Sequence, residues 1–120
     1  MQGESVSERL GDILADALRE EIPIFMSVVN VGEIWYILAR KVSAGEADTS
    51  VSTLGSWGIV FVDADWSLTR EAAALKSRFK ISYADAFAAA LAKTRRAELV
   101  TGDPEFEPLG AYIRIRRMRS

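Results

Sequence analysis

The sequence predicts a single α/β domain over residues 1–120, in which helices pack on a mainly parallel sheet. Segments with strand character alternate along the chain with segments of helical periodicity, and this order indicates parallel strand pairing. The length of 120 residues matches one domain, and no repeat, linker or low-complexity stretch divides the chain. An apolar fraction of 49% and a charged fraction of 27% are typical of a soluble globular protein.

The first two helices are defined by caps and by a proline. Ser5 opens a capping box, and the helix that follows ends by Glu21 because Pro23 cannot continue it. Ser27 is the predicted cap of a second helix over residues 28–42. Apolar side chains lie nearly all round this second helix, so we expect it to be buried on more than one face.

Three further helices are predicted in the middle of the chain. After a break at residues 43–45, the segment 47–54 shows weak helical spacing. Asp65 can cap a fourth helix, which carries apolar residues at helical spacing up to Phe79. The fifth helix covers residues 83–93 and is rich in Ala, the strongest helix former.

Four short segments are predicted as strands. Residues 59–62 are β-branched and aromatic throughout, as expected for a strand covered on both faces. Residues 24–26 and 98–101 are also predicted strands, and residues 112–116 alternate Ile with Arg, which indicates a strand near a sheet edge. The chain therefore begins with a helix, whereas a doubly wound sheet usually begins with a strand.

The composition excludes several kinds of chemistry. The chain has no His and no Cys, so it cannot form a Ser/His/Asp triad, a Cys nucleophile, a thiolate metal site or a disulfide. The formal net charge of −2 excludes a uniformly basic surface for nucleic acid. No apolar run is long enough to span a membrane and the polar first residues do not form a signal peptide, so we expect a cytoplasmic protein without membrane contact.

Three carboxylates lie in apolar or strand-end settings, where a charge is costly unless it is paired or binds a metal. Glu33 lies among apolar residues of the second helix, Asp85 opens the Ala-rich helix, and Asp103 follows the third predicted strand. Each also has a structural explanation. Glu33 can reach solvent or pair with a nearby basic side chain, Asp85 can belong to a capping box, and Asp103 can belong to a turn. If the three converge, they can stay ionised together only around a divalent cation, and oxygen-only ligands suit Mg²⁺ or Mn²⁺.

Three motifs, in this order, resemble a known family. Residues 30–36 (Asn-Val-Gly-Glu-Ile-Trp-Tyr), 82–86 (Ser-Tyr-Ala-Asp-Ala) and 99–106 (Leu-Val-Thr-Gly-Asp-Pro-Glu-Phe) look like three of the four acidic motifs of PIN-domain ribonucleases. The toxin subunits of VapBC toxin–antitoxin pairs are the most similar group. The resemblance implies a three-layer α/β/α sandwich with a mainly parallel central sheet, RNA cleavage that depends on Mg²⁺ or Mn²⁺, and inhibition by a cognate antitoxin protein.

The resemblance also implies roles for individual residues. Glu33, Asp85 and Asp103 correspond by position to the catalytic acids of the family, which bind the metal. Three nearby positions match hydroxyl groups or a further acid that can support them: Ser82, Thr101 and Glu105.

One motif of the family is missing. Its members open with a strand that bears an Asp, whereas the first residues here correspond to the end of that region. We expect that this strand and its Asp either lie before a start that was assigned too late or were lost. Two functions stay open: a metal-dependent endoribonuclease toxin, and a catalytically impaired remnant that binds the antitoxin or RNA. A third interpretation, a phosphoacceptor or small-ligand domain with its site at Asp63, lacks an accompanying Lys and a Gly-rich phosphate loop.

The C-terminal residues are strongly basic. Arg114, Arg116, Arg117 and Arg119 lie together with no acid among them, and they can draw RNA towards an acidic site that would not attract a polyanion by itself. The alternative is that they protect a sheet edge from pairing with another chain. The apolar excess of the first two helices also leaves room for an interface, such as that of a homodimer.

Overall fold

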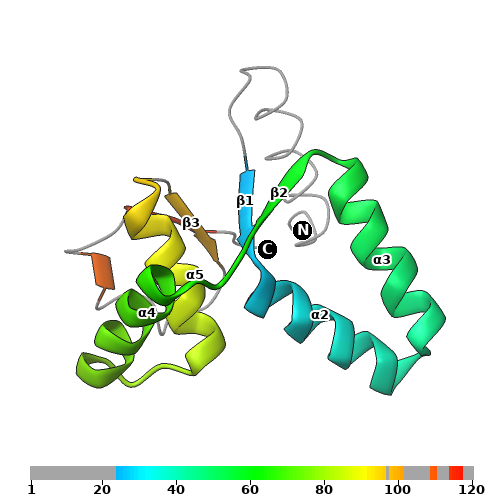
Figure 1. Cartoon of the computed structure of the whole chain (residues 1–120), viewed down its shortest axis with the longest axis horizontal. Helices are drawn as coiled ribbons and strands as arrows, with labels where there is room; N and C mark the ends of the chain where they lie inside the picture. Colours follow the sequence, from blue (N-terminus) through cyan, green and yellow to red (C-terminus); the bar gives the residue numbers. More distant parts are fainter. Residues whose placement is uncertain (1–23, 97, 102–108, 111–113, 118–120) are drawn as a thin grey trace, which may run out of the picture.

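The computed structural model describes residues 24–96, 98–101, 109–110 and 114–117, and it places helices on both sides of short strands (Figure 1). Helices α2 and α3 lie on one side, and α4 and α5 lie on the other. Along the chain, single strands alternate with pairs of helices, which confirms the predicted α/β class. The helix predicted to start at Ser5 lies outside the described residues.

The four described strands form two parallel pairs. β1 (Ile24–Ser27) pairs with β2 (Ile59–Val62), and β3 (Glu98–Thr101) pairs with β4 (Arg114–Arg117). The first three lie where the sequence predicts them. The predicted start of the last strand, at Tyr112, lies outside the described residues.

The described helices have the following bounds: α2 Val28–Lys41, α3 Ala44–Ser56, α4 Trp66–Arg78 and α5 Tyr83–Thr94. Ser27, Asp65 and Ser82 cap α2, α4 and α5, because each side-chain oxygen accepts a hydrogen bond from a backbone N–H of the first turn. Helix α3 begins inside the segment predicted as a break, because Ser43 caps it in the same way. None of these four helices is long and apolar enough to cross a membrane.

Helix α5 ties the two strand pairs together. It contacts β1 and β3, one strand of each pair, although no ladder of hydrogen bonds joins the pairs within the described part of the chain. Ala86, Ala89 and Ala90 of this helix are fully buried, and their small side chains let neighbouring elements approach closely. Arg95 follows the helix and places its guanidinium 4.9 Å from the centre of the Phe25 ring on β1.

The hydrophobic core lies mainly between α4 and α5. The buried residues of α4 are Leu68, Ala72 and Leu75, whose spacing puts them on one face of the helix. They pack with Phe87 and with the buried alanines of α5. Leu109, which follows β3 along the chain, is fully buried in the same cluster.

Helix α2 is less buried than its sequence predicts. Val31 is buried, but Trp35, Tyr36 and Ile37 are exposed, Tyr36 to 48%. The helix contacts α3, the start of α5 and the strands β1 and β2. The prediction of burial on more than one face is therefore met only in part within the described residues, because these three side chains remain at the surface.

Candidate functional site

Glu33 lies at the edge of the sheet where a ligand is expected. It is in the second turn of α2, the helix that begins directly at the carboxyl end of β1. In open parallel sheets, ligands bind beyond the carboxyl ends of the strands. The side chain of Glu33 is half-buried, so it is partly withdrawn from solvent without being enclosed.

Asp85 lies in the first turn of α5 and is also half-buried. Its backbone N–H donates a hydrogen bond to the Oγ of Ser82 over 3.1 Å, which confirms Ser82 as the cap of the helix. A carboxylate in the first turn is also stabilised by the positive end of the helix dipole. The cap uses the backbone of Asp85 and leaves its carboxylate to other partners.

A chain of hydrogen bonds joins the two helices that carry these acids. Ser27, fully buried at the end of β1, donates its hydroxyl to the Oδ1 of Asn30 at 2.6 Å and accepts the backbone N–H of Asn30 at 3.2 Å. The Nδ2 of Asn30 then donates to the backbone carbonyl of Ala84 at 2.9 Å. Asn30 lies one turn before Glu33, and Ala84 immediately precedes Asp85, so this contact holds the two acid-bearing helix starts together.

The other predicted site residues lie at or beyond the edge of the described structure. Asp103 and Glu105 are outside the described residues, and Thr101 is the last residue of β3. Among the residues that the structure describes, no group of three acids is arranged to hold a metal ion. Glu33 and Asp85 are hard oxygen donors on adjoining helices, so the described part of the donor set fits a cation such as Mg²⁺ or Mn²⁺.

The basic C-terminal segment forms a strand. Arg114, Arg116 and Arg117 belong to β4, whose parallel register places Arg114 beside Glu98 of β3. Arg119 lies outside the described residues. Among the described strands, β4 pairs only with β3, so it is an edge strand there. This position is compatible with both predicted roles, protection of the edge and attraction of RNA.

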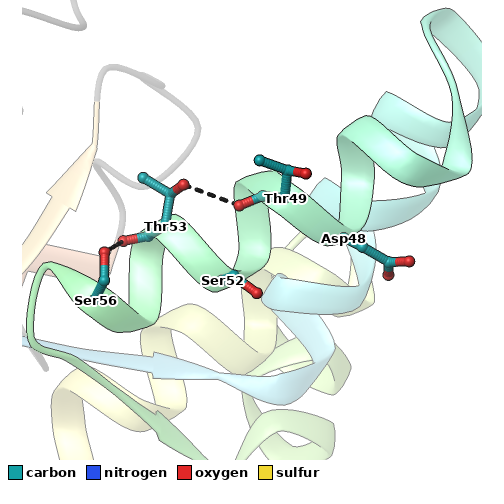
Figure 2. Close-up of a pocket in the computed structure, with 5 residues that line it drawn as sticks. All are labelled: Asp48, Thr49, Ser52, Thr53 and Ser56. Atoms are coloured by element: carbon teal, nitrogen blue, oxygen red, sulfur yellow. Dashed lines mark hydrogen bonds between the residues drawn. The ribbon is translucent and has the colours of Figure 1, made fainter.

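An open hollow on α3 contains none of the predicted site residues. It is lined by Asp48, Thr49, Ser52, Thr53 and Ser56 (Figure 2). The hydroxyls of Thr53 and Ser56 donate to carbonyls of their own helix, at 2.9 and 2.7 Å, and Asp48 accepts a hydrogen bond from an indole of α2. Two of these polar groups bond within α3 and Asp48 bonds α2, so we do not assign a catalytic site to this hollow.

Asn30 has a role that the acidic motifs do not reveal. Its spacing of three residues after Ser27 is a local signal for a helix cap, and the structure confirms that bond. Its contact with Ala84 joins two distant parts of the chain. No local sequence pattern indicates such a contact.

Comparisons with known proteins agree with this architecture. The sequence model of the PIN domain matches residues 6–111, which include all three acidic motifs. A similar solved structure is the crystal structure of VapBC2 from Rickettsia felis bound to a DNA fragment from their promoter, with a TM-score of 0.66 and 17% sequence identity. The match covers 79% of this chain and 74% of that chain, and at this identity it establishes the fold alone. No curated protein sequence matches the chain.

Proposed function

We propose a function on the premise that the chain belongs to the PIN domain family. The proposed protein is an endoribonuclease toxin of a toxin–antitoxin pair, and it hydrolyses RNA phosphodiester bonds with the help of Mg²⁺ or Mn²⁺. Glu33, Asp85 and Asp103 are its proposed catalytic residues and metal ligands. The observation that carries the proposal is the hydrogen bond from Asn30 to Ala84, because it joins the helices that bear the first two acids.

The proposed chemistry follows from the available donors. With no His or Cys in the chain, carboxylates are the natural ligands, and they suit a hard divalent cation. When bound, such a cation activates water and stabilises charged phosphoryl oxygens. The protein would hold Glu33 and Asp85 on two helices whose starts are already joined, so that these carboxylates need little rearrangement to act together.

Three further residues are proposed to support the acids. Ser82 fixes the first turn of α5 through its 3.1 Å bond to the backbone of Asp85. Thr101 ends β3, two residues before Asp103, and Glu105 follows soon after, so both are proposed as helpers near the third acid.

A cognate antitoxin is the proposed protein partner, and a homodimer is a further proposal. The exposed apolar residues of α2 offer a surface for such contacts: Trp35, Tyr36 and Ile37. Exposed large apolar side chains such as these are available for protein–protein contact. The solved VapBC2 structure, which shares the fold, was crystallised with promoter DNA.

A second candidate function is a catalytically impaired domain that binds RNA or an antitoxin. The observation that favours it is the division of the described strands into two pairs. Since no ladder of hydrogen bonds joins the two pairs within the described residues, the acids beyond their strand ends need not converge on one site. In this case the protein would bind RNA without cutting it.

Metal-dependent cleavage is the test of the proposed function. We expect the protein to cut single-stranded RNA only when Mg²⁺ or Mn²⁺ is present, because converging carboxylates need a cation to act on a phosphodiester. Gel electrophoresis of end-labelled RNA, with each cation and with excess EDTA, measures this dependence. Undiminished cutting in EDTA would contradict the mechanism, while RNA binding without cutting at saturating Mn²⁺ would support the second candidate.

The basic strand is expected to make RNA affinity depend steeply on salt. If Arg114, Arg116, Arg117 and Arg119 each contact a phosphate, every Arg→Ala change should reduce the slope of log K against log salt by about 0.7, the value for a single strand. Fluorescence anisotropy of labelled RNA between low and moderate salt measures the slope. An unchanged affinity and slope in the fourfold Ala variant would leave edge protection as the role of these residues.

A further inference from the structure

We infer that Asn30 is a positioning residue, which sets the separation of Glu33 and Asp85 and thereby the affinity of the site for a divalent cation. The inference rests on the proposed function, because it concerns the same acids. Asn30 itself is not proposed to touch the cation or RNA. It would act through the two helix starts that its side chain joins.

The side-chain amide of Asn30 has a defined orientation. The carbonyl oxygen of Ala84 can only accept a hydrogen bond, so the group that faces it at 2.9 Å must be the Nδ2 donor. The Oδ1 then faces the hydroxyl of Ser27, which donates to it at 2.6 Å. Ser27 is the last residue of β1 and is fully buried, so its hydrogen bond to Asn30 lies in the interior.

The contact does more than satisfy local backbone groups. Capping of α2 needs only the backbone N–H of Asn30, which already donates to Ser27. The carbonyl of Ala84 lies within α5, where regular helical geometry gives it an acceptor role for the N–H four residues later. The amide of Asn30 is therefore an additional link, and what it adds is a fixed distance between two helices.

The acids lie close to this link along the chain. Glu33 follows Asn30 by three residues and shares its side of α2, while Asp85 is the residue directly after Ala84. Metal ligands must be held within fractions of an ångström, and the groups that orient them matter almost as much as the ligands. Loss of a group that hydrogen-bonds a metal ligand directly typically weakens metal binding ~10- to ~100-fold, and Asn30 acts one step further away, through the backbone of Ala84.

The test is direct Mn²⁺ binding by Asn30→Leu, which keeps the approximate volume of the side chain but removes both hydrogen-bonding groups. We expect its Kd for Mn²⁺, measured by calorimetry without RNA, to rise ~10-fold, the lower end of the range for groups that bond a ligand directly. High Mn²⁺ should restore RNA cleavage by this variant, because its ligands are intact, whereas it should not restore cleavage by Asp85→Asn. If Asn30→Leu fails to fold, Asn30→Ser replaces it, since this shorter polar side chain cannot reach the carbonyl of Ala84.

The control for a general weakening of the fold is Ser43→Ala, which removes the cap of α3. The Oγ of Ser43 accepts the N–H of Glu46 at 3.1 Å, so its loss weakens a helix start away from the acids. An equal loss of Mn²⁺ affinity in Ser43→Ala and Asn30→Leu, or wild-type affinity in Asn30→Leu, would overturn the inference. If Asp85→Asn weakens Mn²⁺ binding while Asn30→Leu does not, the proposed metal site stands and the inference alone fails. If Asp85→Asn also binds Mn²⁺ like the wild type, both fail.

Discussion

Asp85→Asn is expected to lower the rate of RNA cleavage at least ~100-fold without disrupting the fold. The substitution removes a negative ligand, but it keeps the shape of the side chain and the backbone N–H that Ser82 accepts at 3.1 Å. The free energy of unfolding should decrease by no more than ~1 kcal/mol, because only the interaction of the charge with the helix dipole is lost. Initial rates at saturating Mn²⁺ and thermal melting measure the two quantities.

Glu46→Gln is the matched control for this substitution. Glu46 lies in the first turn of α3, and its backbone N–H donates to the capping Ser43 at 3.1 Å, the same local setting as that of Asp85. The control therefore removes the same charge from the same kind of position on another helix. We expect it to cut RNA at the wild-type rate. Equal rates for Asp85→Asn and Glu46→Gln would show that Asp85 is not a catalytic ligand.

Local chemistry accounts for the parts of the fold that the sequence predicts well. The caps Ser27, Asp65 and Ser82 are confirmed because a cap depends on a side chain and an N–H only a few residues away. The strand at Ile59–Val62 is confirmed because its residues are β-branched or aromatic throughout. Ser43 as the cap of α3 is also local, but the neighbouring Ala-Gly suggested a longer break than the structure has.

Features that depend on which elements meet are less predictable. Alternation of strands and helices indicates parallel pairing, and both observed pairs are parallel. The order of strands and helices along the chain does not show which strands are neighbours in the sheet. It therefore does not predict that β1 and β3 share no hydrogen bonds within the described residues. Likewise, the apolar residues of α2 predict burial, but what covers a helix is decided by its neighbours, and here Tyr36 is left exposed.

The candidate site shows the same division between local and distant contacts. Motif order selected Glu33 and Asp85, and the structure places both on helices that meet at Asn30. The contact that brings these helices together is not encoded by spacing within either motif. Asp103 lies outside the described residues, so its convergence with the other two acids stays a prediction.

Phe87→Ala is expected to be the most destabilising single substitution among those considered. Phe87 is only 6% exposed in the core between α4 and α5, and its removal should cost ~3 to ~5 kcal/mol of the free energy of unfolding. A domain of this kind has a total stability of roughly 5–15 kcal/mol, so the variant would lose a large part of it. Because α5 also carries Asp85 and contacts both strand pairs, the loss should weaken the site together with the fold.

Tyr83→Ala separates the effect of burial from that of aromatic contact. Tyr83 lies one turn earlier on the same helix, with its ring centre 5.4 Å from that of Phe87, but it is 45% exposed. Its removal leaves no enclosed cavity, so the cost should be about 1 kcal/mol, close to that of an aromatic pair. Urea unfolding followed by circular dichroism gives both values. Similar midpoints for the two variants would mean that the Phe87 site collapses after truncation, and that the packing between α4 and α5 is looser than its burial indicates.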